Sequence, residues 1–241
     1  MRIAVLSDIH GNLEALEAVL EDAERAGAAA IYSLGDIVGY GPSPARCIEI
    51  VRSRAAVSLI GNHDAAVAGL EPLEWFNEYA RRAVEWTRGR LDAGQIDYLG
   101  SLPYIHRGPD LLLAHASPVE PERWHYIHGL ADLGEPFALF AERLCFVGHT
   151  HRPGIYAVGR RREAERCGSR RQLGKGLRHL VNAGSVGQPR DGDPRAAYAL
   201  FDEERETVQL RRVPYEVART QQRMRAAGLP PFLIERLAAG I

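Results

Sequence analysis

Cysteine is scarce in this sequence, and the cysteines that are present do not form a recognisable site. Only three of the 241 residues are cysteines. Cys47, Cys145 and Cys167 lie far apart and include no Cys-x-x-Cys unit, which argues against a disulfide framework and against a zinc knuckle. With neither kind of site indicated, we expect a cytoplasmic protein.

Long hydrophobic runs and a large net charge are also missing. No apolar run approaches the roughly 20 residues of a membrane-spanning helix, and Asp8 interrupts the region where a signal peptide would need its apolar core. A formal net charge of −1 gives no overall attraction to nucleic acid or to an anionic membrane. We therefore expect neither as a partner, and the sequence leaves the oligomeric state open.

What remains is the composition of an ordinary globular protein. The chain is 46% hydrophobic and 25% charged, and 241 residues can bury a sizeable core. We predict a single α/β domain over residues 1–241. It should carry a helical insertion at about residues 65–108 and C-terminal helices at about residues 215–240.

Apolar runs of buried-strand length each end abruptly in a residue that can bind a metal. These runs cover residues 3–6, 30–34, 56–60, 111–114 and 144–147. A glycine directly precedes Asp36, Asn62 and His149, as expected where the chain turns sharply off a strand. Because open α/β sheets bind ligands at the carboxyl ends of their strands, we expect these side chains to converge.

The polar residues at these strand ends form a donor set without sulfur. They are Asp8, His10, Asp36, Asn62, His115, His149 and His151. Oxygen and nitrogen donors suit divalent manganese, iron, zinc, nickel or cobalt, and of these we favour manganese. The set exceeds what one catalytic ion needs, and a carboxylate such as Asp36 can bridge two ions. Two ions against two carboxylates leave the site positive, so it should attract a phosphate ester.

The order of these motifs resembles the calcineurin-like metallophosphoesterase superfamily. The motifs are Asp8-Ile9-His10, Gly35-Asp36, Gly61-Asn62-His63-Asp64, His115 and Gly148-His149-Thr150-His151. Residues 182–190 are similar to a loop of its small bacterial and archaeal phosphodiesterase-like branch. The resemblance implies a four-layer α/β/β/α sandwich of two mixed sheets flanked by helices. It also implies hydrolysis of small phosphate esters, with phosphodiesters favoured.

The resemblance further implies roles for individual residues. One ion would be held by Asp8, His10, Asp36 and His151, and the other by Asp36, Asn62, His115 and His149. A metal-activated hydroxide would attack the phosphorus. His63 would stay uncoordinated and act as the general acid, or steady the charge of the transition state.

Other interpretations stay open at this stage. A single Asp or His at a strand end often caps a helix or satisfies a buried polar group. The enzyme could instead be a phosphomonoesterase or a dinucleoside polyphosphate hydrolase. A protein of another class, a catalytically silent scaffold such as the retromer subunit that resembles this fold, is also conceivable. Because His63 and every ligand position are filled here, we favour catalysis.

The rest of the chain yields coarser predictions. Asn12 should cap a helix that ends before Gly27, and Pro44 should begin a second helix. Aromatic residues of the insertion at residues 73–86 should mostly pack in a core, although the insertion could wall the site. Strands after residue 154 should form a second, more antiparallel sheet that packs on the first. We predict that the arginine-rich stretch at 160–178 is a solvated hairpin rather than a polyanion site.

Departures from better-known relatives bear on the substrate. Protein serine/threonine phosphatases and diadenosine tetraphosphatases carry Arg-Gly where this chain has Tyr40-Gly41. The phosphatases also carry an orienting Asp where this chain has Gly39. A monoester dianion benefits most from an arginine fork, so we predict a preference for diesters. Candidate substrate-binding residues are Asn12, Tyr40, Arg152 and Arg190.

Overall fold

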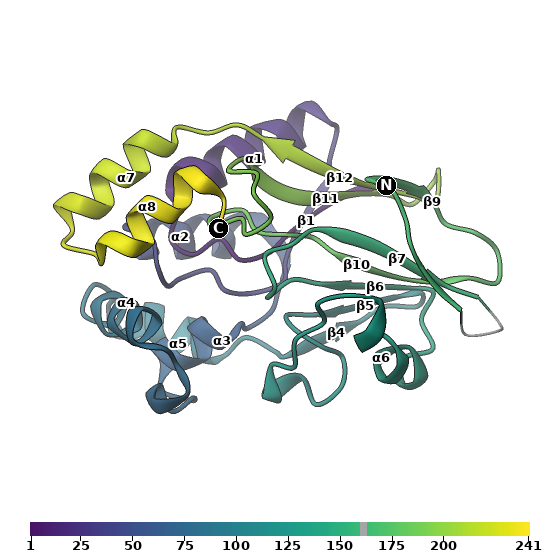
Figure 1. The fold of residues 1–241 in the computed structure, drawn as a ribbon, viewed down its shortest axis with the longest axis horizontal. Coiled ribbons are helices and arrows are strands. Elements are labelled where there is room, and N and C mark those ends of the chain that lie inside the picture. Colours follow the sequence, from purple (N-terminus) through teal and green to yellow (C-terminus); the bar gives the residue numbers. More distant parts are fainter. Residues whose placement is uncertain (160–162) are drawn as a thin grey trace.

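Two six-stranded sheets packed face to face form the centre of the computed structural model (Figure 1). Residues 1–159 and 163–241 are described. The strands are β1 (Arg2–Leu6), β2 (Ala30–Ser33), β3 (Ala55–Ser58), β4 (Ile105–Arg107), β5 (Leu111–Ala114), β6 (Leu144–Val147), β7 (Gly154–Val158), β8 (Ala164–Arg166), β9 (Arg170–Gln172), β10 (Arg178–Asn182), β11 (Ala196–Asp202) and β12 (Thr207–Val213). The α-helices are α1 (Leu13–Arg25), α2 (Pro44–Arg54), α3 (Asn62–Ala68), α4 (Glu78–Arg88), α5 (Ala93–Gly100), α6 (Gly134–Leu139), α7 (Val217–Ala226) and α8 (Pro231–Ala239). Short 3₁₀ turns cover Leu73–Trp75, Pro121–Arg123 and Leu130–Asp132.

Each sheet combines parallel and antiparallel pairs. The first sheet has the order β3-β2-β1-β11-β12-β9, and the second has the order β4-β5-β6-β10-β7-β8. Strands β1, β2 and β3 run parallel, as do β5, β6 and β10, while the other pairs are antiparallel. The predicted architecture of two mixed sheets flanked by helices is confirmed.

The predicted division of strands between the sheets is wrong. We expected the strands after residue 154 to form the second sheet together, but β11, β12 and β9 join β1 in the first sheet. The early strands β5 and β6 lie instead in the second sheet beside β10. Candidate ligands therefore come from both sheets and converge at their common edge.

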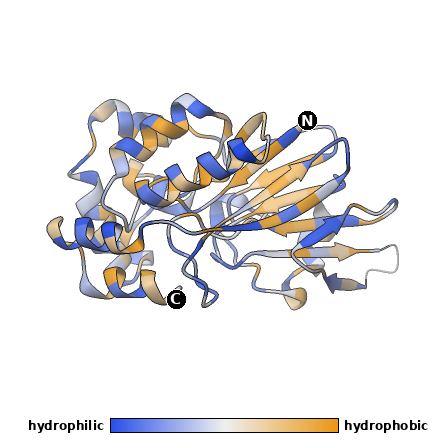
Figure 2. Cartoon of the chain, turned by 90° about the horizontal axis from the view of Figure 1, so that it is seen from above, coloured by the Kyte–Doolittle hydropathy of each residue, from blue (hydrophilic) through white to orange (hydrophobic). Residues whose placement is uncertain are grey.

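Apolar side chains fill the space between the sheets and beneath the outer helices. The layer between the sheets contains Ile3 and Val5 of β1 and Phe146 of β6. A second cluster joins β1 and β11 to α1 and α2, and a third joins β5, β6 and β10 to α6. Figure 2 shows the strands as the most continuously hydrophobic part of the chain. The layers thus stack as helices, sheet, sheet and helices.

Local signals place the first two helices as predicted. The side chain of Asn12 accepts a hydrogen bond of 3.2 Å from the Ala15 amide and so caps α1. Gly27, with φ of 75°, follows the end of this helix. Pro44 occupies the first turn of α2. Both helices therefore begin close to the loops that follow β1 and β2.

The insertion and the C-terminal helices meet at one end of the sandwich (Figure 1). Ala80 and Ala83 of α4 pack with Met224 of α7 and Leu233 of α8. Tyr40, from the loop after β2, belongs to the same apolar cluster. The insertion is less regular than predicted, because a 3₁₀ turn precedes α4 and a short helix, α3, starts at Asn62. These helices form one wall of the region where the strand ends converge.

The strands on either side of the arginine-rich stretch, β7 and β10, pair antiparallel as the predicted hairpin requires, but the stretch between them is more than a simple hairpin. Strand β8 pairs with β7 in the second sheet, whereas β9 pairs with β12 in the first. The stretch therefore crosses from one sheet to the other. Arg160, Arg161 and Arg162 lie outside the described residues. No helix in the described part of the chain is long and apolar enough to cross a membrane.

His179 is buried in the layer between the sheets without a hydrogen bond from its ring. It lies two residues before Val181, which faces this layer, and neither ring nitrogen has a partner among the described residues. Burial, reinforced by the charge of Arg171, lowers the pKa of His179 to about 4, against 6.5 ordinarily. Between these two pKa values, this histidine therefore binds a proton in the unfolded chain but not in the folded protein.

We expect this histidine to make stability fall as pH falls from about 6.5 to about 4. Over that window the unfolded state gains the proton first, so the free energy of unfolding should drop by up to roughly 3 kcal/mol. Urea unfolding at several pH values measures the slope. His179→Leu should flatten it, while His128→Leu at an exposed position should not. Equal slopes for wild type and His179→Leu would refute the assignment.

Candidate active site

The loops that follow β1, β2 and β6 hold their predicted ligands in an unusual backbone conformation. Positive φ angles between 51° and 64° occur at Asp8, His10, Asp36, His149 and His151. An L residue in this region costs roughly 1–2 kcal/mol. Such strain persists only where the surrounding structure over-determines it, and it gathers at functional sites.

Glycines allow these loops to approach one another closely. A Cβ atom on Gly61 would collide with the Asp36 carboxylate, and one on Gly148 would collide with the Ser7 hydroxyl. Gly35 has a φ of 110°, a conformation that favours glycine. The prediction of sharp turns and close approach at these glycines is confirmed.

One group of ligand atoms joins the loops after β1 and β6. The Nε2 atom of His151 lies 3.1 Å from Oδ1 of Asp8 and 3.1 Å from Nε2 of His10. The distance from His10 Nε2 to Asp8 Oδ1 is 3.7 Å. All three side chains are buried, so their lone pairs converge on one small volume away from bulk water.

A second group of ligand atoms joins the loop after β2 to the ends of β5 and β6. Asp36, His115 and His149 have ligand atoms within 4.8 Å of one another. Oδ2 of Asp36 lies 3.5 Å from Nε2 of His115 and 3.6 Å from Nε2 of His10. Asp36 therefore stands between the two groups of ligand atoms.

Several atoms of the donor set are buried without any hydrogen bond to the described residues. They are Oδ1 of Asn62, Nε2 of His115 and Nε2 of His149. Leaving such a group unpaired costs about 1–3 kcal/mol, so native proteins rarely do so without a purpose. Nitrogen and oxygen lone pairs aimed into one buried volume are what a divalent cation requires, and the residues present fit metal ions well.

Backbone carbonyl groups fix the orientation of three candidate ligands. Nδ1 of His10 lies 3.0 Å from the Val38 carbonyl, and Nδ1 of His115 lies 3.2 Å from the Leu34 carbonyl. Nδ1 of His151 lies 2.6 Å from the carbonyl of Gln188. Donation from Nδ1 leaves the lone pair on Nε2, the atom that faces the site in each case.

The loop at residues 182–190 braces the ligand loops from behind. Nδ2 of Asn182 donates to the Gly148 carbonyl at 2.7 Å, and the Ser185 hydroxyl donates to the Asp8 carbonyl at 2.8 Å. The Gln188 carbonyl that orients His151 belongs to the same loop. This loop, which resembles one in the phosphodiesterase-like branch, therefore supports the site rather than supplying ligands.

Burial and mutual charge hold the site in the protonation state that binds metal. Burial lowers the pKa of His149 to about 3 and also lowers the pKa of His10 and His151. Burial alone would raise the pKa of Asp36, but the neighbouring histidines, His115 first, hold it well below its usual range. Metals bind neutral imidazole and ionised carboxylate.

His115 is the exception among these histidines. Burial lowers its pKa, but the charge of Asp36 outweighs burial and raises the pKa of His115 to about 9. A proton on Nε2 of His115 would point at the Asp36 carboxylate, 3.5 Å away. A cation between these two side chains would replace that shared proton, so binding there should release it.

His63 faces the two ligand groups from the start of α3. Its ring centroid lies 5.0 Å from that of His10 and 4.4 Å from that of Tyr40, and it packs edge-on against Phe76. Its Nδ1 has no hydrogen bond to the described residues. A Cβ atom on Gly39 would lie only 2.6 Å from that nitrogen, so no larger residue at position 39 fits beside this ring.

Asp64 has a structural role that was not predicted from the sequence. Its carboxylate accepts hydrogen bonds of 3.1–3.2 Å from the amides of Ile37, Val38 and Gly61. These amides belong to the loops after β2 and β3. Asp64 thus locks together the two loops that carry the Asp36 and Asn62 side chains.

The candidate substrate-binding residues differ in where their side chains lie and in what they contact. Both ends of the Asn12 side chain already have partners within the protein, the Ala15 amide and the Gly187 carbonyl, and a contact of Asn12 with substrate stays a prediction. Arg152 turns its Nε toward the carbonyl of Arg190 at 2.9 Å. The Arg190 guanidinium lies 5.7 Å from the Tyr40 ring centroid, beside the site.

A pocket of about 250 Å³ opens directly beside these side chains. Its wall includes Tyr40, Asn62, His63, Phe76, Trp124, Tyr126 and His149. Sequence reasoning missed Trp124 and Tyr126, whose rings pack at 5.8 Å from His115 and 4.0 Å from His149. The available signal was a pair of aromatic residues shortly after the His115 strand end. The insertion contributes to this wall through Phe76, which agrees with the interpretation that the insertion could wall the site.

The sequence and the fold match known proteins over most or all of the chain. Residues 1–206 match the calcineurin-like phosphoesterase superfamily domain. Phosphodiesterase YfcE of Escherichia coli is 30% identical over 203 residues, which cover 84% of this chain and 88% of the relative. An uncharacterized protein of Methanocaldococcus jannaschii is 38% identical over 99% of this chain and 98% of its own length.

A solved structure matches the whole architecture. The metallophosphoesterase from Sphaerobacter thermophilus is 45% identical, with a TM-score of 0.88, and the match covers 100% of this chain and 99% of that one. The similarity therefore includes the helices at the end of the sandwich as well as both sheets.

Proposed function

The chain belongs to the calcineurin-like phosphoesterase superfamily and is a metal-dependent phosphoesterase, and we propose that it cleaves phosphodiesters with two divalent metal ions. Tyr40 is the observation that carries the choice of a diester. It is buried against His10 and His63 at the position where protein serine/threonine phosphatases and diadenosine tetraphosphatases carry an arginine. A diester bears one negative charge and needs less cationic help than a monoester dianion.

The ligand groups support the two-ion arrangement. One ion would be held by Asp8, His10, Asp36 and His151, and the other by Asp36, Asn62, His115 and His149. Bound there, the ions supply Lewis acidity toward the phosphoryl oxygens and activate water. Manganese suits four imidazoles with oxygen donors, and iron, zinc, nickel and cobalt are the alternatives that elemental analysis would identify.

His63 would act on the leaving group. It lies beside both ligand groups, and its own ring nitrogen Nδ1 is not committed to another described residue. Burial lowers the pKa of His63 to about 4, so a bound phosphate anion would be needed to favour its protonated form. In that complex it donates its proton, or a hydrogen bond, to the departing alkoxide oxygen.

Two further groups would bind the substrate. Arg190 lies over Tyr40 and is held by Gln188, with Nη2 2.7 Å from Oε1, so its charge is available at the site without a carboxylate partner among the described residues. Phe76, Trp124 and Tyr126 give the pocket flat apolar surfaces. They suit a small ester whose leaving group carries a planar or apolar substituent.

We infer a cytoplasmic setting from the cysteine pattern.

The proposal predicts at least about ten-fold higher kcat/KM for a diester than for the matching monoester. Bis-p-nitrophenyl phosphate and p-nitrophenyl phosphate share one leaving group, so the comparison holds the leaving group constant while the second ester group and the charge on the phosphate change. Cyclic nucleotides and diadenosine tetraphosphate extend the series. A preference for the monoester would favour a phosphomonoesterase, and one for the dinucleotide would favour a polyphosphate hydrolase. Either preference overturns the diester assignment.

A further inference from the structure

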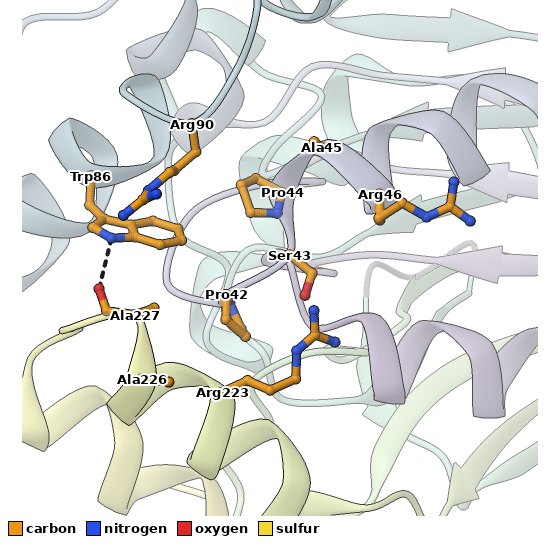
Figure 3. Close-up of a pocket in the computed structure, with 10 residues that line it drawn as sticks. All are labelled: Pro42, Ser43, Pro44, Ala45, Arg46, Trp86, Arg90, Arg223, Ala226 and Ala227. Atoms are coloured by element: carbon orange, nitrogen blue, oxygen red, sulfur yellow. Dashed lines mark hydrogen bonds between the residues drawn. The ribbon is translucent and has the colours of Figure 1, made fainter.

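A second cavity, of about 500 Å³, lies on the other side of the loop that carries Tyr40 (Figure 3). It is open to one side and is bordered by the start of α2, by α4 and by α7, with Pro42, Trp86 and Ala226 among its walls. The volume lies within the range of small-molecule sites. None of its lining residues belongs to the candidate active site. What this cavity binds must therefore be argued from its own groups.

Ser43 is an N-cap residue whose side chain does not cap. Its hydroxyl makes no hydrogen bond to the helix, and Oγ has no partner anywhere in the described part of the chain, although the residue is only 5% exposed. In Figure 3 this hydroxyl points away from α2, to the side of the cavity from which Arg223 enters. A buried hydroxyl left unpaired costs about 1–3 kcal/mol, and a ligand that accepts a hydrogen bond from it would remove that cost.

The first turn of α2 adds donors at the same place. The helix has eleven residues and begins with Pro44, and the Ala45 and Arg46 amides donate to none of the described residues. Free amides at a helix N-terminus carry partial positive charge and commonly bind phosphate or carboxylate groups. The unpaired Ser43 hydroxyl lies beside them, so an oxyanion could accept from all three groups.

Two arginines bring positive charge to the cavity. Arg90, two residues after α4, lies 5.1 Å from the Trp86 ring centroid and has no carboxylate partner among the described residues. Arg223 of α7 shares the single carboxylate of Glu14 with Arg219, at 2.7 Å and 3.6 Å. Two cations on one anion leave an excess positive charge. Among the described residues, no aspartate or glutamate lines the cavity.

We propose that this cavity is a second binding site, separate from the metal centre, for the phosphate group of a small molecule. The Ser43 hydroxyl and the α2 amides donate hydrogen bonds to the phosphate oxygens, and Arg90 and Arg223 supply the charge. The volume leaves room for an organic group attached to the phosphate, bordered by Trp86. The site does not depend on which ester the metal centre cleaves.

Titration calorimetry with inorganic phosphate and with adenosine 5′-monophosphate tests this site. The measurement is made on the manganese-loaded protein and on the metal-stripped protein, in which the metal centre no longer holds phosphate. We expect the stripped protein to keep one binding site. Ser43→Ala and Arg90→Gln should each weaken that site about five- to ten-fold, the loss of one hydrogen bond or one charge.

Arg82→Gln is the matched control. Arg82 is an exposed residue of α4 that pairs with Glu78, and it is not among the residues that line the cavity, so its loss should leave the affinity unchanged. Tighter binding of the nucleotide than of phosphate would identify an organic phosphate as the ligand, and equal binding would identify free phosphate. The proposal fails if the stripped protein binds neither probe, or if folded Ser43→Ala and Arg90→Gln both bind as tightly as wild type.

Discussion

Stripping divalent metal from the protein should lower its phosphoesterase activity by at least about 10³-fold, and manganese should restore activity better than magnesium. The size follows from the several kcal/mol that metal ions contribute to stabilising charge at phosphorus. The preference follows from the donor set, which contains four histidines, whereas magnesium prefers oxygen ligands. Dialysis against a chelator followed by assay with a chromogenic phosphate ester measures both effects. Elemental analysis should find up to two ions per chain.

Asp36 provides the sharpest variant for this experiment. Its Oδ2 lies between His10 and His115, while its Oδ1 accepts the His63 amide at 2.9 Å. Asp36→Asn keeps an acceptor for that amide but removes the charge, so it should lose both metals while staying folded. Asp36→Ala should do the same, and His125→Ala at an exposed position should keep both. Full activity in the stripped protein, or two metals bound to Asp36→Ala, would contradict the two-ion centre.

The positions of the ligand loops were predictable because their signals are local. An apolar run followed by glycine and then Asp or His describes a strand, a turn and a donor within a few residues, and Gly35 with Asp36 is the clearest instance. Backbone geometry then explains the pattern, since a turn of this kind holds Asp36 at a φ of 52°. Such signals need no knowledge of distant contacts.

The partition of strands between the sheets was not predictable in this way. Ile3 of β1 pairs with Phe201 of β11 almost 200 residues away, and nothing in either apolar run specifies that partner. The same holds for β9 (Arg170–Gln172), whose three residues are all polar and so carry no apolar–polar alternation in the sequence. Pairing over such separations is decided by the packing of the whole sandwich.

Residues that complete the pocket were missed for a related reason. Trp124 and Tyr126 lie in an irregular segment, where no periodicity indicates which way a side chain points. Asn12 shows what the sequence does not reveal about a residue beside the site, because its polar atoms bind the Ala15 amide of α1 and the Gly187 carbonyl.

Replacing His63 should separate metal binding from catalysis. His63→Gln and His63→Ala should keep both ions but lose about 10²–10⁴-fold in kcat, the usual contribution of a general acid. The ligand groups do not need this ring, because Asp8, His10 and His151 form one and Asp36, His115 and His149 form the other. Elemental analysis and steady-state kinetics on the same samples measure the two properties together.

The dependence on the leaving group distinguishes proton donation from a merely structural role for His63. A p-nitrophenolate group leaves without help, whereas an alkyl alkoxide needs a proton, so the loss in kcat should be much smaller for a nitrophenyl diester than for an alkyl diester. A structural defect would lower both rates equally. A ring nitrogen of His63 also lies within 4.8 Å of the ligand atoms of His10 and Asp36. Loss of one metal ion in His63→Gln would therefore show that this histidine is itself a metal ligand. His128→Gln, an exposed position, is the control that should change neither the metal content nor either rate.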